Sequence, residues 1–167
     1  MKKLVFLISF VFISGCYPTA NFKSMTVEDL RIVKSVKYNN SIQVGSVSGG
    51  SETSWITGIP KINNENLKLA IDGSLANNKL LAAGDNAKYR LDVTLVELKL
   101  PLGGFSMSVD TLMKYRITGA GSESVVEIRK TGTAEFSEAF IGAARLNIAN
   151  EKSAYENIKE FIKVITQ

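Results

Sequence analysis

The 167-residue chain has no histidine and a single cysteine, Cys16, and each shortage excludes a class of chemistry. Without histidine, serine and cysteine triads lack their usual general base, and most zinc sites lack a usual ligand. With one cysteine the chain forms no internal disulfide, so its stability must come from burial of apolar side chains. The sequence also lacks a phosphate loop with its lysine, a G-x-S-x-G elbow and an S-x-x-K pair. We therefore expect no enzyme activity, no cofactor and no metal site.

Strong charge of one sign and long apolar runs are missing too. The formal net charge is +4, and setting aside Lys2 and Lys3 lowers it to +2. Charges of both signs are interspersed without a long block of either, so the chain has no electrostatic signature of nucleic-acid binding. The apolar run from Leu4 to Ile13 is too short to span a bilayer as a permanent helix.

The N-terminus has the anatomy of an export signal. A charged start and the apolar run are followed by the small-residue exit Ile13-Ser14-Gly15-Cys16. A branched apolar residue, two small residues and a cysteine resemble the lipobox of bacterial lipoproteins, in which the cysteine is lipidated and becomes the new N-terminus. The alternative is a buried apolar thiol, but a signal segment offers no core to bury it in. The resemblance implies removal of residues 1–15, a lipid on Cys16 and attachment to a membrane.

Residues 16–40 are predicted to be the lipidated N-terminus and a tether. Pro18 and the small residues after it are typical of a spacer. Thr26 followed by Asp29 predicts a helix start, with an extended lead-in as the alternative. In lipoproteins an aspartate after the cysteine is associated with retention in the inner membrane. Tyr17 at that position therefore implies the outer membrane, with the domain facing the periplasm.

Residues 41–167 are predicted to form one α+β domain of six elements. These are a strand at 41–46, a helix from Asn63 or Asn64 to Gly84, strands at 89–100, 105–118 and from 126 towards 136, and a helix from 143. Short turns between the three consecutive strands imply an antiparallel meander. The expected fold is a two-layer sandwich of a mostly antiparallel sheet (β-α-β-β-β-α) with two helices on one face.

Two strands carry more detailed information. In the strand at 89–100 the apolar phase changes at Val96, which predicts a bulge or a twist within one long strand. From Phe105 through Met107, Met113 and Tyr115, apolar residues keep one face of the next strand. Such residues usually form a closed core, and the alternative is an interior that opens to take an acyl chain or another lipid.

Two surfaces are candidates for binding a protein partner. Trp55 and Ile56 lie in the Gly/Ser-rich loop 48–64, where an aromatic side chain either anchors a partner or folds back on the core. The polar face of the strand at 105–118 offers four further residues. These are Ser106, Ser108, Lys114 and Arg116. A membrane tether raises the effective concentration of a domain near other envelope proteins, so a binding role explains an anchor without a catalytic site.

Carboxylates are the remaining catalytic option. Glu135 and Glu138 lie near a strand end, and Asp92 and Glu97 lie on the first long strand. A glycosidase needs two carboxyl groups at a defined separation in a cleft. Nothing in the spacing of these residues indicates such a pair, and charges on a solvated strand face explain them as well.

The strand phrase Lys88-Tyr-Arg-Leu-Asp-Val-Thr-Leu opens the meander, and the element order around it resembles the small YajG-type lipoproteins. From Ser41 onward the chain is also similar in outline to the auxiliary lipoproteins of envelope transport and lipopolysaccharide assembly. The resemblance implies an outer-membrane lipoprotein with a non-catalytic accessory or adaptor role and an envelope protein partner. Lipid or glycolipid binding is the alternative, and a carboxylate-based cell-wall hydrolase is the third reading.

Overall fold

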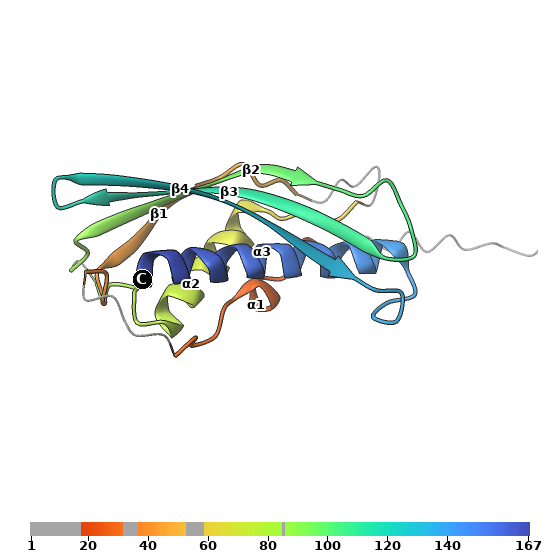
Figure 1. The fold of residues 1–167 in the computed structure, drawn as a ribbon, viewed down its shortest axis with the longest axis horizontal. Helices are drawn as coiled ribbons and strands as arrows, with labels where there is room; N and C mark the ends of the chain where they lie inside the picture. The colour runs from red at the N-terminus through yellow and green to blue at the C-terminus, as the bar shows by residue number, and fades with distance from the viewer. Residues whose placement is uncertain (1–17, 32–36, 53–58, 85) are drawn as a thin grey trace, which may run out of the picture.

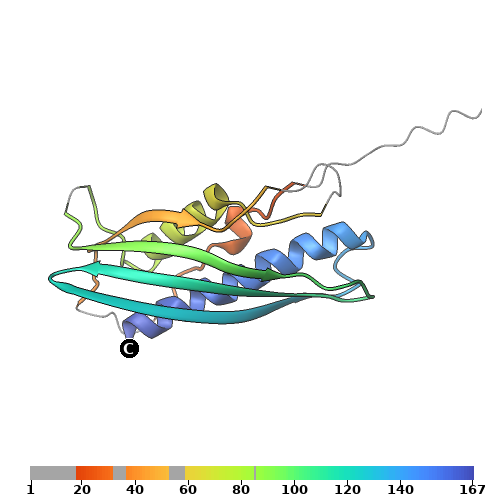
Figure 2. The ribbon, with the colours of Figure 1, turned by 90° about the horizontal axis from the view of Figure 1, so that it is seen from above.

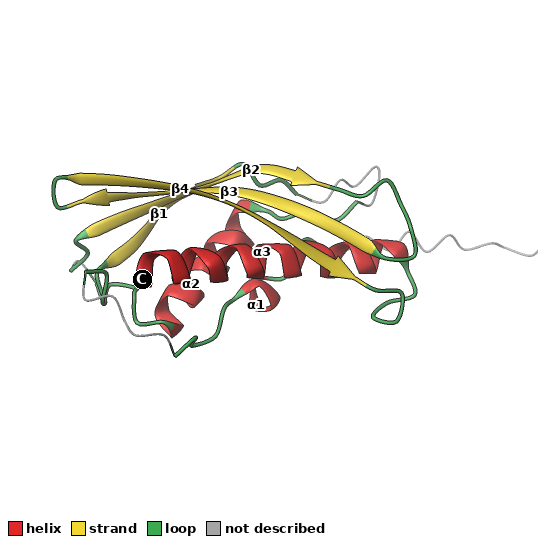
Figure 3. Cartoon of the chain, viewed as in Figure 1, coloured by secondary structure: helices red, strands yellow, loops and turns green. Residues whose placement is uncertain are grey.

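A four-stranded sheet forms one layer and helices form the other, as predicted (Figures 1 and 3). The computed structural model describes residues 18–31, 37–52, 59–84 and 86–167. The strands are β1 (Ile42–Ser48), β2 (Tyr89–Lys99), β3 (Met107–Gly119) and β4 (Ser122–Ala134), and the helices are α1 (Phe22–Met25), α2 (Asn64–Asn77) and α3 (Gly142–Thr166). β1 pairs parallel to β2, and the other two pairs are antiparallel. The α+β class and the order of the six expected elements are confirmed, and α1 is an addition.

The β3–β4 hairpin is the most regular part of the sheet. Its register runs without a break from the Met107–Ala134 pair to the Gly119–Ser122 pair. The two residues of its turn, Ala120 and Gly121, have φ angles of 49° and 73°. Two successive left-handed residues make a type I′ turn, whose twist matches that of the flanking strands.

The change of apolar phase in β2 is a bulge, as predicted. The pairing of β2 with β3 shifts between Leu95 and Glu97, and Val96 turns outward with 51% of its surface exposed. Leu91, Val93 and Leu95 before the shift are buried. The bulge therefore lets one long strand keep its first half on the core while its second half follows the twist of the sheet.

Helix α2 begins where the sequence predicts but ends earlier. The side chain of Asn63 accepts a hydrogen bond from the Asn66 amide at 2.8 Å, which caps the helix. The predicted stop at Gly84 was wrong, because the helix ends at Asn77 and Lys79 is left-handed with φ 56°. Leu81, whose spacing fits the helix, instead forms a bridge with Ile42 of β1, and the carbonyl of the buried Leu80 beside it accepts from the Ile42 amide at 3.0 Å.

The predicted helix start at Thr26 was also wrong, because Thr26 is the C-cap of the short helix α1. Ala20, Met25 and Val27 have no exposed surface, and the Val27 amide donates to the Ser74 hydroxyl at 2.8 Å. The described residues from Ala20 to Leu30 are thus packed against the domain.

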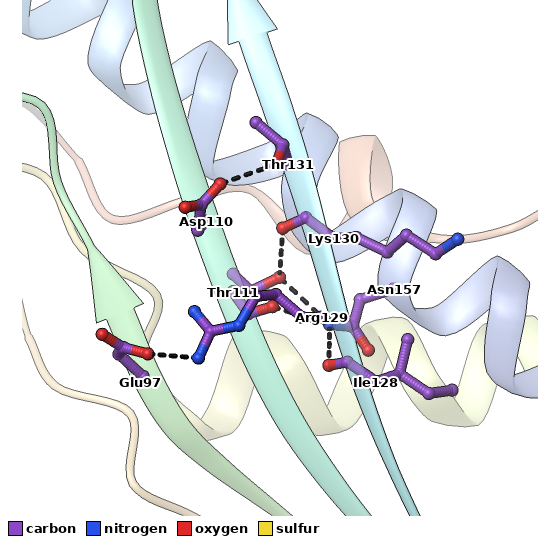
Figure 4. A network of polar contacts seen from close by, with 8 residues as sticks. All are labelled: Glu97, Asp110, Thr111, Ile128, Arg129, Lys130, Thr131 and Asn157. Carbon is purple, nitrogen blue, oxygen red and sulfur yellow. Dashed lines mark hydrogen bonds and ion pairs between the residues drawn. The ribbon is translucent and has the colours of Figure 1, made fainter.

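Helix α3 crosses beneath β3 and β4 (Figure 2) and meets them through buried polar groups as well as apolar ones. The Tyr115 ring stacks on Phe161 with centroids 4.0 Å apart. Asn157 has no exposed surface, and its amide nitrogen donates to the carbonyl oxygens of Thr111 (3.1 Å) and Ile128 (2.9 Å) (Figure 4). Its amide oxygen accepts from the Tyr115 hydroxyl at 3.0 Å. These contacts fix the helix on the sheet in one register.

Candidate functional site

Three of the predicted site residues, Cys16, Trp55 and Ile56, lie outside the described residues. The other four are described and do not form one surface. Ser108, Lys114 and Arg116 lie on the solvent face of β3, whereas Ser106 precedes the strand in the loop between β2 and β3. The sequence period placed Ser106 on the strand face because alternation alone does not show where a strand begins.

The solvent face of the sheet carries polar side chains that pair across the strands. Arg116 lies 3.7 Å from Glu123, Lys114 lies 3.9 Å from Glu127, and the Ser108 and Thr133 hydroxyls are 2.9 Å apart. Figure 4 shows two more such pairs, Arg129 with Glu97 at 2.6 Å and Thr131 with Asp110 at 2.6 Å. Exposed pairs of this kind contribute little stability. They balance the charge of this face, so it presents no strong field to a partner.

Lys114 and Arg116 also line a cleft of about 360 Å³ at the β1–β2–β3 side of this face, with Ser46, Asp92 and Thr94. The backbone amide and the hydroxyl of Ser46 both donate to one Asp92 oxygen at 2.7 Å. Hydrogen bonds from Arg90 first and from Ser46 next lower the pKa of Asp92 to about 2, against the opposing effect of burial. This carboxylate therefore stays ionised and holds the irregular segment of β1 on β2.

The other carboxylates weighed as catalytic groups have local partners as well. Glu97 pairs with Arg129, as described above. Glu138 lies 2.8 Å from the Lys152 ammonium and accepts from the Glu135 amide at 3.0 Å. The hydrogen bond from Lys152 is the main cause that lowers the pKa of Glu138. These two contacts hold the Glu138 carboxylate in place and stabilise the turn that follows β4.

The apolar residues expected on one face of the strand at 105–118 separate into two environments. Met113 and Tyr115 have no exposed surface and belong to the core, where burial raises the pKa of the Tyr115 hydroxyl and keeps it neutral. Phe105 is 83% exposed and precedes the strand, which corrects its placement on the buried face. Met107 lines a small cavity at the end of the sheet. The segment therefore supplies both core and surface.

Phe105 belongs to an exposed apolar cluster that sequence analysis did not identify, and we call it the apolar tip. Its members come from the β2–β3 loop and the β4–α3 loop, which meet at one end of the molecule (Figures 1 and 2). They are Leu102, Phe105, Phe136, Phe140 and Ile141, with exposures of 109, 83, 43, 81 and 55%. The ring centroids of Phe105 and Phe136 are 6.2 Å apart, and those of Phe136 and Phe140 are 5.3 Å apart.

Arg145 joins the two loops of the apolar tip from beneath. It is 6% exposed, and one guanidinium nitrogen donates to the carbonyl oxygens of Ala139 and Phe140, both at 2.8 Å. The other terminal nitrogen donates to the Gly104 carbonyl at 3.5 Å, and the guanidinium lies 5.0 Å from the centre of the Phe136 ring. Within the described residues no carboxylate pairs with it. The buried charge is therefore held by backbone carbonyls and by an aromatic face.

Beside the apolar tip lies an apolar cavity of about 250 Å³. Its walls come from the segment before α2, the β2–β3 loop and the first turns of α3, and they include Pro60, Leu102, Met107, Ala143 and Leu146. This volume is just below the usual range of small-molecule sites. The cavity is thus a shallow extension of the apolar tip.

Neither a metal cluster nor a membrane-crossing helix is found in the described part of the chain. No group of three or more acidic, cysteine or histidine residues there is arranged to hold an ion. None of the helices there combines the length and the hydrophobicity needed to cross a bilayer.

The fold is shared with solved structures, although no protein-family model and no curated protein matched the sequence. A candidate lipoprotein from Caulobacter crescentus has a TM-score of 0.53 and 16% identity, over 77% of this chain and 90% of that chain. A Xanthomonas campestris protein of the family DUF330 has a TM-score of 0.51 and 9% identity, over 81% and 90% of the two chains. An uncharacterized protein has a TM-score of 0.52 and 10% identity, over 84% and 99%. At these identities the likeness establishes the common fold.

Proposed function

We propose that this chain is a lipoprotein of the bacterial envelope, anchored to the outer membrane through Cys16, with a non-catalytic accessory or adaptor role. One observation carries the proposal, namely that a lipobox stands directly before a closed α+β domain. Only Tyr17 separates Cys16 from Pro18, and Ala20 is already fully buried. The anchor therefore holds the domain close to the membrane surface. The candidate lipoprotein with the same fold supports this reading.

The adaptor role is supported by the polar groups of the domain, which have partners inside the domain. Asp92, Glu97 and Glu138 each have a local cationic partner, so each is explained by a contact within the domain. The Asn157–Tyr115 pair is buried and fixes α3 on the sheet. These polar groups stabilise the domain itself. We therefore infer that the anchored domain acts by binding a neighbouring envelope protein through its surface.

Lipid or glycolipid binding is the second candidate, and the cavity of about 250 Å³ beside the apolar tip favours it. An apolar chain end entering there would contact Leu102, Met107 and Leu146. The interior of the sandwich is a poorer site for such a ligand, because Met113 and Tyr115 are fully buried against α3.

Lipidation is tested by expressing Cys16→Ala beside the wild type in cells supplied with labelled palmitate. We expect the label only in the wild type, which should fractionate with the outer membrane, while Cys16→Ala should be released from it. Tyr17→Asp is the matched control, because it should keep the label but move the protein to the inner membrane. Recovery of Cys16→Ala in the outer membrane would contradict the anchoring part of the proposal.

The adaptor role needs its own experiment, which is cross-linking in living cells followed by gentle purification and mass spectrometry of proteins and lipids. Near-stoichiometric recovery of one envelope protein would support the adaptor reading. A bound lipid recovered without a protein partner would favour the second candidate and would direct attention to the cavity beside the apolar tip.

A further inference from the structure

We infer that the apolar tip is a membrane-contacting wedge, which enters the lipid surface beside the acylated N-terminus and fixes the orientation of the domain. This inference rests on the proposed lipidation of Cys16. Its first support is where the exposed apolar residues gather. Leu102, Phe105 and Phe140 are the most exposed of the large apolar residues in the described ranges, and all three lie in the tip. Contiguous exposed apolar surface marks a contact with another apolar phase.

The second support is the composition of the two loops. Residues 100–106 and 139–144 contain no charged side chain. Entry of these residues into the lipid surface would therefore carry no charged side chain of their own into it, and the Arg145 guanidinium beneath them already donates to the Ala139 and Phe140 carbonyls. Glu135 and Glu138 lie just outside this uncharged part, and Glu138 is paired with Lys152.

The third support is the position of the N-terminal chain. Pro18 lines one surface hollow with Asn147 of α3, and the Ala20 amide donates to the Lys61 carbonyl at 3.0 Å, next to Pro60 of the tip cavity. Asn147 stands five residues after Gly142, which is about 7.5 Å along the helix axis. Cys16 stands two positions before Pro18, and this stretch of chain spans at most about 7 Å. An extended chain can thus bring the acylated cysteine to about the level of Gly142, where α3 begins beside the tip.

The fourth support is that the tip is held in place. Arg145 fastens the two loops through the Gly104, Ala139 and Phe140 carbonyls, and the Phe136 ring lies between Phe105 and Phe140. The aromatic side chains therefore point outward from a fixed frame. A fixed apolar projection and a lipid chain at the same level supply the two membrane signals that stable, oriented binding requires.

The inferred orientation has a consequence for the rest of the molecule. The β3–β4 turn and the C-terminus of α3 lie at the opposite end from the tip (Figures 1 and 2). With the tip in the lipid, this far end points away from the membrane. The polar face of the sheet would then stand upright and remain accessible to water.

The test uses the mature acylated chain in vesicles of phosphatidylethanolamine and phosphatidylglycerol. Leu102→Cys places a spin label at the tip, and Val125→Cys, at a residue 46% exposed on β4, is the matched control. The lipid occupies the sulfur of Cys16, so the introduced thiol is the one that is labelled. We expect collisions with oxygen relative to a water-soluble nickel complex to be severalfold more frequent at Leu102 than at Val125. Equal, water-like accessibility of the two labels would overturn the inference.

Two further measurements distinguish this inference from its alternatives. The intact mass of the protein reports acylation first, so an unmodified Cys16 refutes the anchor itself, whereas an acylated protein with a water-exposed tip refutes only the wedge. In cells, a photo-cross-linker at Leu102 should capture phospholipid. Capture of one protein at this position, with the label water-exposed in vesicles, would show that the tip docks on a protein and would overturn the membrane assignment.

Discussion

Asn157→Leu is the change that tests most directly how α3 is fixed on the sheet. Leucine has a similar size and no polar atoms in its side chain, so the substitution removes four hydrogen bonds between buried groups, including one to the Thr111 hydroxyl at 3.2 Å. The carbonyl oxygens of Thr111 and Ile128 each lose a donor, and the Tyr115 hydroxyl keeps only the Met113 sulfur at 3.3 Å. Leaving a buried polar group unsatisfied costs about 1–3 kcal/mol. Because leucine regains some apolar burial, we expect the free energy of unfolding to fall by about 3–4 kcal/mol.

The assay is equilibrium urea unfolding of residues 18–167, followed by far-ultraviolet circular dichroism. With a slope of about 2 kcal/mol per molar urea, the loss lowers the unfolding midpoint by about 1.5–2 M. Asn77→Leu is the control, since Asn77 is exposed and makes one hydrogen bond, to the Val27 carbonyl at 3.0 Å; it should cost no more than about 1 kcal/mol. If Asn157→Leu changes stability no more than this control does, the buried network does not hold the helix and the reasoning fails. Tyr115→Phe combined with Asn157→Leu should cost less than the sum of the two single changes, because they share one hydrogen bond.

Two other predictions follow from the sheet. A methyl group at Gly132 would overlap the backbone of Ser153 and Ala149 in α3, so Gly132→Ala should lower the stability by about 2–3 kcal/mol in thermal unfolding. Gly142→Ala, whose added methyl meets a flexible side chain at 3.5 Å, should be neutral or slightly stabilising, and equal effects of the two changes would contradict the close approach of α3 to β4. Asp92 has a folded pKa of about 2, below its ordinary 3.8, which corresponds to a stabilising effect of about 2 kcal/mol that solvent screening of this partly exposed group reduces to ~1 kcal/mol. The effect is present above about pH 4 and lost between pH 4 and 2. Asp92→Asn should remove this part of the acid dependence when urea midpoints are compared from pH 2 to 6, and an unchanged slope would show that Asp92 does not cause it.

The sequence by itself determined the elements whose residues repeat with one clear period. Alternation predicted β3, the phase change at Val96 predicted the bulge in β2, and Asn63 predicted the start of α2. Each of these depends on contacts within a few residues or on one buried face, and such contacts leave a local pattern. The lipobox is likewise a local pattern, and the prediction of an anchor at Cys16 depends on it alone.

The tertiary structure decided the features that depend on contacts between distant segments. Leu81 fits the helical spacing of α2, but it lies beyond the end of the helix and forms a bridge with Ile42 of β1. Phe105 fits the alternation of β3 but precedes the start of that strand. Asparagine and arginine usually face solvent on a helix. Asn157 and Arg145 are nevertheless buried, because backbone carbonyls of other segments accept their hydrogen bonds. The apolar tip gathers residues from two loops more than thirty positions apart. Periodicity is a property of neighbours in the chain, whereas burial and exposure are set by what the fold brings next to each side chain.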